Sequence, residues 1–373
     1  MRPSDGLASG FTILRVSIPA SPSKGEMRVR QSEKNRSQIS SRLLSPSVRA
    51  NISPGVSLGH LILEACMQVM RLSSLLLILF VPTLHAQGKT VAERLGYPAS
   101  AKLLILHGDD LGVAHSVDAA SLAALDAGAI SSASIMMPTP WVTEVAAYAR
   151  AHPNADLGLH LTITSEWETY RWGSVAPRDQ VQSLLDSTGT FPSDVPPVVV
   201  RAKAAEVERE LRAQVERAFA LGIRPTHLDS HMGALFPTND LIGAYIKVAH
   251  DYHLPFLATL GNPPGVTNVP LATNDVVLDA VIVASPDVPR DHWKKFYLNA
   301  IANLKPGLSE IIVHLGHDDA ELQAVMVNHE PYGSAWRQRD YEVVTSAEFK
   351  KAIADNHVIL VRWRDLAPLL AQR

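Results

Sequence analysis

LLILHGDD, residues 103–110, is an apolar run of strand length that ends directly on two carboxylates. Two later segments have the same form, LGLHL at residues 157–161 and THLDSH at residues 226–231. A fourth, EIIVHLGHDD at residues 310–319, also reaches a histidine. The carboxyl ends of parallel strands meet at one face of a barrel or sheet, so these polar groups are expected to lie together. Carboxylates and imidazoles gathered there indicate an open divalent-metal site with a carboxylate left for acid–base chemistry.

Strand-like and helix-like segments alternate on both sides of these motifs. Strands are expected at residues 102–107, 132–137, 156–161, 226–229, 256–259, 310–314 and 358–361. Helices are expected at residues 116–127, 141–151, 198–221, 241–250, 291–304 and 346–355. Repeated βα units predict an α/β fold with a parallel sheet and outer helices. We therefore expect a (β/α) barrel, either TIM-like or a distorted seven-stranded version, with long loop insertions on its C-terminal face.

The first 86 of the 373 residues differ in character from the rest of the chain. Residues 67–86 contain a basic start at Arg71, a short apolar run and a small residue, Ala86, which together predict a secretory signal peptide and a periplasmic or secreted protein. A buried core helix is the alternative, although Pro82 interrupts it. Residues 1–66 are rich in Ser, Arg and Pro, and are expected to be disordered or an upstream extension assigned in error. Residues 87–373 then form a single barrel domain.

The charge distribution agrees with this division. Residues 1–66 contain nine basic and four acidic residues, whereas residues 87–373 contain 24 basic and 33 acidic residues. So acidic a domain is a poor candidate for binding nucleic acid. The only cysteine, Cys66, lies upstream of the apolar run, so any metal held by residues 87–373 must be bound by histidine and carboxylate. That run is also too short for a stable membrane span.

Two long connections without clear periodicity interrupt the alternation, at residues 162–197 and 261–289. Loops of this length in a compact domain are usually functional. The first contains Trp167, Tyr170 and Trp172. Their rings either stack on the apolar faces of sugars or pin the loop to the barrel, and the sequence does not separate these interpretations.

The individual polar residues allow more than one role. Asp109 and Asp110 suit a metal site, but Asp-Asp-x-Gly is also turn and N-cap chemistry. His160 lies near the end of an apolar strand, as either a satisfied core residue or a ligand. His314 follows another strand and is a natural proton donor to a leaving group.

The segment around Asp229 carries a polar stripe. On an extended strand His227, Asp229 and His231 share one face. His231 extends furthest beyond the strand and is the preferred ligand. Asp229 or His227 is then expected to orient a neighbouring ligand.

Taken together, the motifs resemble those of the YdjC-like carbohydrate deacetylases, relatives of the polysaccharide deacetylase superfamily. The resemblance is carried in order by LHGDDLGVAHSVDAAS, GAISSASIMMPTPW, DLGLHLTITSEW, RPTHLDSHMGALFP, EIIVHLGH and RQRDYE. Members often have further histidines after Asp-Ser-His, where this chain has Met232 and Gly233.

This resemblance implies a (β/α) barrel with one divalent cation bound by Asp110, His160 and His231. It also implies Asp109 as general base and His314 as general acid. The tail of the family pattern suggests that Arg337 or Arg339 approaches the site, for example to keep Asp109 ionised.

The expected function is metal-dependent removal of an acetyl group, N-acetyl first, from a carbohydrate or amino-sugar oligosaccharide. The expected cofactor is one divalent cation, Mg²⁺ or Zn²⁺, with Mn²⁺ or Co²⁺ as alternatives. The expected partner is the acetylated sugar, with no nucleic acid, no stable membrane span, and a homodimer as a candidate assembly. Two alternatives remain: another metal-dependent barrel hydrolase, such as a phosphoesterase or amidase, and a secreted glycan-binding module without turnover.

Overall fold

The structure of the protein is a computed structural model that describes residues 89–371. Within these residues seven parallel strands form one curled sheet. They are β1 (Lys102–Leu111), β2 (Ser132–Ile135), β3 (Leu157–Leu161), β4 (Leu228–Ser230), β5 (Ala280–Val283), β6 (Gly307–Val313) and β7 (Val358–Leu360). The strand order is β4-β3-β2-β1-β6-β5, and β7 pairs with the first residues of β1. The predicted α/β barrel class is confirmed, in the form of a half-barrel. The predicted extension, signal segment and Cys66 lie outside the described residues.

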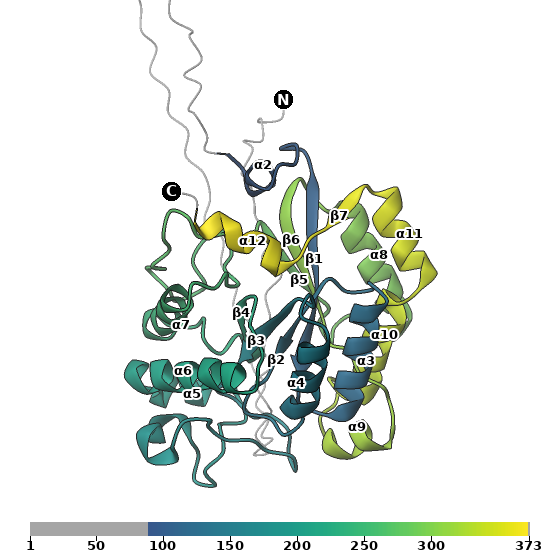
Figure 1. Ribbon diagram of the computed structural model, residues 1–373. Coiled ribbons are helices and arrows are strands. Elements are labelled where there is room, and N and C mark those ends of the chain that lie inside the picture. Colours follow the sequence, from purple (N-terminus) through teal and green to yellow (C-terminus); the bar gives the residue numbers. More distant parts are fainter. Residues whose placement is uncertain (1–88, 372–373) are drawn as a thin grey trace, which may run out of the picture. The chain divides into compact units, whose positions relative to one another are not determined.

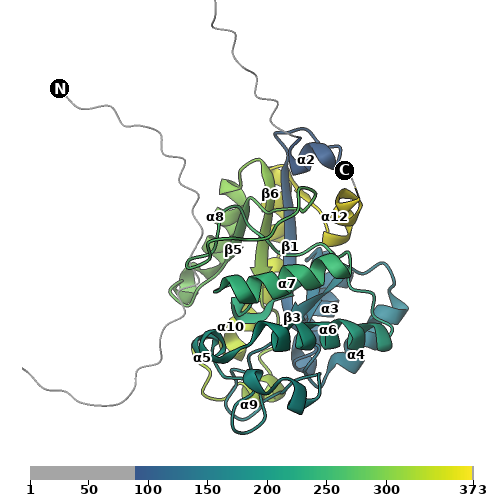
Figure 2. The same ribbon diagram turned by 90° about the vertical axis from the view of Figure 1, so that its left-hand side faces the viewer.

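Most of the helices pack on the outside of the sheet, whereas α2 (Val91–Arg94) and α12 (Trp363–Leu370) contribute to the apolar cluster on its inner face. The others are α3 (His115–Asp126), α4 (Val142–Ala151), α5 (Val195–Arg201), α6 (Ala204–Ala220), α7 (Asn239–Asp251), α8 (Trp293–Asn303), α9 (Ala320–Val325), α10 (Ser334–Val344) and α11 (Ala347–Asp355). Figures 1 and 2 show α3, α4, α8, α10 and α11 on one side and α5, α6 and α7 on the other. α2 and α12 lie at the end where β1 begins.

The two faces of β1 are buried in different surroundings. Leu104 and Leu106 belong to the large core cluster beneath the outer helices. Leu103 and Ile105 alternate with them and join a second cluster, which includes Trp363 of α12. Because strand side chains alternate between faces, this second set is the inner face of the sheet. The same inner face continues with His107 and Asp109, so it changes from apolar to polar along the strand.

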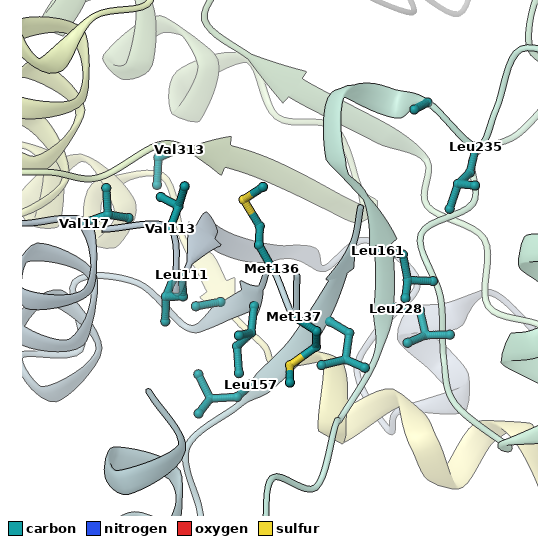
Figure 3. Close-up of a cluster of buried hydrophobic side chains, with 14 of the residues drawn as sticks. Leu111, Val113, Val117, Met136, Met137, Leu157, Leu161, Leu228, Leu235 and Val313 are labelled. Carbon is teal, nitrogen blue, oxygen red and sulfur yellow. The ribbon is translucent and has the colours of Figure 1, made fainter. Parts of the chain in front are cut away.

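The large cluster fixes the strands that lead to the site. Figure 3 shows Leu111, Val113, Val117, Met136, Met137, Leu157, Leu161, Leu228, Leu235 and Val313 packed together. Burying a Leu or Met side chain contributes about 1.5–3 kcal/mol. This packing holds the carboxyl ends of β1, β3, β4 and β6 near one another.

The prediction of a single helix at residues 198–221 is wrong, because this segment is divided between two helices, α5 and α6. α5 begins after Asp194, whose carboxylate accepts the Val195 N–H. The chain is extended at Ala202 and Lys203 before α6 starts. There the Lys203 N–H donates to Ser183 Oγ at 3.1 Å, outside the helical pattern. A side chain from the preceding loop thus ends one helix and starts the next.

The expected strand at residues 256–259 is also wrong. It is reduced to single bridges, from Phe256 to Leu228 and from Thr259 to Leu278. β5 instead forms inside the segment expected to be irregular, residues 261–289. The apolar run 280–283 pairs with β6 because the preceding long loop brings it beside that strand. Within residues 89–371, no helix combines the length and apolar character needed to cross a bilayer.

Candidate metal centre and active site

The end of β1 brings two neighbouring carboxylates to one site. Adjacent residues of a regular strand point to opposite faces. Here the register with β2 shifts between Gly108 and Leu111, and Asp110 adopts a φ of 71°. Non-glycine residues rarely adopt this left-handed conformation, although Asp tolerates it better than most. Both carboxylates consequently approach His160 Nε2, Asp109 through Oδ2 at 3.8 Å and Asp110 through Oδ1 at 3.3 Å.

The three predicted metal ligands converge on one point. His160 comes from β3, and His231 directly follows β4, its partner strand. Asp110 Oδ1 lies 3.3 Å from His160 Nε2 and 3.2 Å from His231 Nδ1. One ligand atom from each of these residues lies within 4.8 Å of the others, and all three side chains are buried.

This donor set fits a divalent cation. Asp110 Oδ1 is buried and makes no hydrogen bond of acceptable geometry, although it points between two imidazoles. An orphaned buried oxygen is costly unless a cation or donor occupies the space before it. One carboxylate and two histidines, with the remaining positions open, also match the ligand number of catalytic rather than structural sites.

Each histidine of this group has a second carboxylate on its other ring nitrogen. His160 Nδ1 is 2.7 Å from Asp229 Oδ1, on the ring edge opposite Asp110. His231 Nε2 is 2.9 Å from Glu166 Oε2. Such contacts fix the orientation and tautomer of a ligand imidazole and raise its basicity. Asp229 is thus beside a neighbouring ligand, as the strand pattern predicted, whereas Glu166 was not predicted.

Neighbouring charged groups shift the pKa values of both Asp110 and His231. Burial alone would raise the pKa of Asp110, but the Arg337 guanidinium and the two ligand histidines hold it well below its usual range. Burial would lower the pKa of His231, but Glu166 and Asp110 outweigh it and raise this pKa to about 9. The imidazole therefore carries a proton when no metal is bound, and a cation binding there would replace it.

Arg337 approaches the site, but not the residue expected. Its Nη2 donates to Asp110 Oδ2 at 2.7 Å. The suggested pairing with Asp109 is therefore corrected to Asp110. Arg337 reaches this position because α10 begins close to the end of β6 and presents its buried face to the site. Arg339, on the same helix, lies over the Trp293 ring at 4.9 Å instead.

Asp109 and His314 face each other beside the triad. Asp109 Oδ1 is engaged by His107 Nε2 at 3.0 Å and Ser134 Oγ at 3.3 Å. Its Oδ2 is directed to the open side, 3.9 Å from His314 Nε2. The His314 side chain is 19% exposed, so a molecule in solution can reach it. Burial lowers the pKa of His314, and the nearby carboxylates only partly offset this.

The backbone and ring of His314 are held from α10. Its N–H donates to Asp340 Oδ2 at 2.9 Å, and its ring lies 5.0 Å from the Trp336 ring. Nδ1 is buried without a hydrogen-bond partner. Nε2 is therefore the nitrogen that faces the site.

Three other predicted residues are buried and offer no open ring face to a substrate. His227 is fully buried, stacks on Trp363 at 5.1 Å and is grouped with His107 and Asp229 rather than with the three proposed ligands. Trp167 is 0% exposed and Trp172 is 4% exposed, so neither offers an open ring face. They pack against each other, with ring centroids 5.7 Å apart. Of the two interpretations of this loop, the geometry favours pinning it to the barrel.

Sequence reasoning missed two residues of the site. His107 precedes Asp109 by two positions, and the period of a strand would have placed it on the same face. Glu166 lies in an irregular loop, where no periodicity relates it to His231. Its contact depends on how the loop folds back, so no local signal indicated it.

The family model described as YdjC-like protein matches residues 103–355. A carbohydrate deacetylase from Thermus thermophilus is 33% identical over 281 residues, which cover 73% of this chain and 96% of that protein. A carbohydrate deacetylase from Geobacillus stearothermophilus is 28% identical, covering 71% and 98%.

A solved structure shares the fold. It is that of a proposed cellobiose-phosphate cleavage protein from Enterococcus faecalis, with a TM-score of 0.60 and 24% identity. The match covers 72% of this chain and 99% of that one.

Proposed function

Because the chain belongs to the YdjC-like family, we propose that it is a metal-dependent hydrolase that removes acetyl groups from a carbohydrate, in the first place the N-acetyl group of an amino sugar. The names of the two deacetylase relatives support the reaction class. The observation that carries the proposal is the meeting of Asp110, His160 and His231 beside a second carboxylate, Asp109, whose Oδ2 also faces His314.

Asp110, His160 and His231 would hold the cation. When bound, a divalent cation supplies Lewis acidity and lowers the pKa of a water molecule from 15.7 to about 7 in favourable cases. No cysteine is among these ligands, so Zn²⁺, Mg²⁺, Mn²⁺ and Co²⁺ are all compatible with the donor set.

Asp109 is assigned as the general base. Oδ1 is held on the inner side by His107 and Ser134, which leaves Oδ2 to accept the proton of the attacking water. Arg337 pairs with Asp110 rather than Asp109, so Asp109 keeps an uncommitted lone pair toward the open side. A positioned base of this kind contributes about 10²–10⁴-fold in rate.

His314 is assigned as the general acid. Its Nε2 faces Asp109 Oδ2 across 3.9 Å, and a leaving amine between them would receive its proton from Nε2. A lowered pKa makes the protonated imidazole a stronger acid, while reducing the fraction protonated at neutral pH. As the C–N bond breaks, its electron pair stays on the nitrogen, which takes the proton from Nε2 and leaves as the amine.

The proposal is tested by measuring acetate released from a panel of N-acetylated and O-acetylated mono- and oligosaccharides, with and without a chelator. Release that stops with chelator and returns with added divalent ion is the expected result. A phosphate or amino acid product would assign the site to a phosphoesterase or amidase. Glycan binding that persists with chelator, without any product, would assign it to a binding module. Either outcome would overturn the deacetylase proposal.

We also infer that the protein is exported to the periplasm or secreted. The basic start at Arg71 and the apolar run that ends before Ala86 support this inference. N-terminal sequencing of the protein recovered from its producing cells tests it. A mature chain beginning at Gln87 is expected, and a cytosolic chain that retains residues 70–86 would contradict it.

A further inference from the structure

His107 is a buried histidine inside the half-barrel that contacts carboxylates of the site. The proposed reaction assigns it no role. His107 lies on the inner face of β1, two residues before Asp109, and is 0% exposed. The residues before it on this face, Leu103 and Ile105, are apolar. An imidazole at such a depth requires polar partners, because burying it without them is costly.

The ring of His107 contacts two carboxylates through a single nitrogen. Nε2 is 3.0 Å from Asp109 Oδ1 and 3.1 Å from Asp229 Oδ2. Ser134 Oγ lies 3.0 Å from the same nitrogen. On the other edge, Nδ1 is 3.1 Å from Ser132 Oγ. The ring therefore joins β1 to its neighbour β2 and to the more distant β4.

A third carboxylate, Glu310 Oε1, lies 3.7 Å from Nδ1 of His107. The two carboxylates on Nε2 each have a second, functional neighbour. Asp109 has its other oxygen toward His314, and Asp229 has its other oxygen on His160 Nδ1. Two buried carboxylates this close repel each other unless a cation lies between them. Burial opposes the imidazolium, but hydrogen bonds to Asp109 and Asp229 outweigh it and raise the pKa of His107 well above its usual value.

We propose that His107 is a positioning residue that holds Asp109 and Asp229 in one fixed arrangement below the metal ligands. Through Asp109 it sets the direction of the base, and through Asp229 it sets the orientation of the ligand His160. This inference rests on the proposed function, since the roles of Asp109 and His160 come from it.

A neighbouring histidine shows that burial alone does not create this arrangement. His227 is equally buried, and its ring lies 5.0 Å from that of His107. The nearest carboxylate recorded for it is Asp156, at 3.9 Å, and its Nε2 has no hydrogen-bond partner. His227→Gln is therefore a matched control for the loss of a buried imidazole.

The experiment compares His107→Gln, His107→Leu and His227→Gln in the full chain. Acetate release gives kcat and KM at saturating Zn²⁺, and titration of the metal-free protein gives the Zn²⁺ dissociation constant. Because residues that orient ligands typically contribute 10–100-fold, we expect kcat to fall about 10-fold for the Gln variant and about 100-fold for the Leu variant. KM should change by less than about twofold, because the substrate does not touch His107. The Zn²⁺ dissociation constant should rise about tenfold through Asp229.

The outcomes separate the two ideas. An active wild-type protein whose His107→Gln variant keeps kcat and Zn²⁺ affinity within about threefold overturns the positioning role and leaves the deacetylase proposal standing. Equal losses in His227→Gln also overturn it, because they would reflect packing. If wild-type protein releases no acetate but binds Zn²⁺, the deacetylase proposal fails. The Zn²⁺ affinity of His107→Gln then decides whether His107 positions Asp229 and His160. With neither acetate nor Zn²⁺ binding, both fall. Should His107→Leu not fold, His107→Gln carries the test.

Discussion

Both histidines proposed as metal ligands have a carboxylate on the ring nitrogen that faces away from Asp110. Asp229 serves His160 from the next strand, and Glu166 serves His231 from a loop. The strand pattern predicted Asp229, because its spacing from His231 is visible in the chain. Glu166 was not predictable, because its contact arises from the course of an irregular loop. The alternation of a strand thus contains the signal for Asp229, and also for His107, whereas no local pattern indicates a partner such as Glu166 that a loop supplies.

Glu166→Gln is expected to weaken Zn²⁺ binding by about 10–100-fold, because the neutral amide no longer fixes His231 or raises its basicity. Isothermal titration of the metal-free protein measures this change. Glu168→Gln is the control, since Glu168 lies in the same loop but is directed to the surface, where it accepts from Asn328 at 2.8 Å. Equal affinity in the two variants would show that Glu166 has no role at the centre.

Single elements show where periodicity succeeds and where it fails. β1, β3 and β6 follow directly from their apolar runs, since their burial depends only on the alternation of side chains. β5 was not predicted, because it is a four-residue strand reached through a long loop and fixed by its pairing with β6. The break between α5 and α6 depends on Ser183, a tertiary contact that local helix propensity cannot include.

Gly158→Ala tests how closely β3 and β4 pack inside the sheet. A Cβ at Gly158 would lie 2.3 Å from His227 Cε1, in a ring that Trp363 holds from the other side. Overpacking of this kind costs about 1–3 kcal/mol. Urea unfolding measures the loss.

Gly243→Ala provides the contrast. A Cβ there meets no atom within 4 Å, on the regular helix α7. Alanine should stabilise that helix by about 0.5–1 kcal/mol. If Gly158→Ala unfolded at the same urea concentration as the wild-type protein, the His227 ring would have to move aside without cost, and the close packing would be contradicted.

The start of α3 contains a buried acid that makes stability depend on pH. Burial raises the pKa of Asp118 to about 8, and its Oδ2 has no hydrogen-bond partner. The folded protein therefore holds a proton that the unfolded chain releases near pH 4. Stability from this group falls as the pH rises from about 4 to about 8 and is then constant.

Asp118→Asn should remove this dependence. The amide oxygen can still accept the Gly112 N–H, which Asp118 Oδ1 binds at 2.6 Å. We expect little change near pH 4 and about 1–3 kcal/mol of added stability near pH 8, measured by urea unfolding across this range. Asp126→Asn, at the exposed end of the same helix, is the control. A difference that shrinks with rising pH would contradict the assignment.

At the scale of the whole molecule, the site draws on segments that are distant in the chain. Asp110 lies on β1, His160 on β3 and His231 directly after β4, and Arg337 comes from a helix more than a hundred residues later. A cation bound there would join these segments in the folded state only. The order and spacing of the motifs indicated this convergence, whereas the inward turn of Asp110 depends on a bulge that no motif shows.

Metal binding should therefore stabilise the entire fold. At a free Zn²⁺ concentration 100 times the dissociation constant, linkage predicts about 2.7 kcal/mol of added unfolding free energy. Denaturant unfolding with Zn²⁺ and with chelator measures the difference. His231→Ala should fold in both conditions but show no gain. An equal gain in that variant would place the Zn²⁺ elsewhere.

The contact between His160 and Asp229 has a further consequence, for folding. These residues are direct partners across β3 and β4, as are Leu159 and Leu228. A slip of β4 by one position would bring Leu228 or Ser230 opposite His160 and turn Asp229 alone toward the helices, which would break the ion pair. Strands this short have few other side chains to fix their register. The polar residues assigned to chemistry thus also distinguish the native strand alignment from its nearest misfolded alternative.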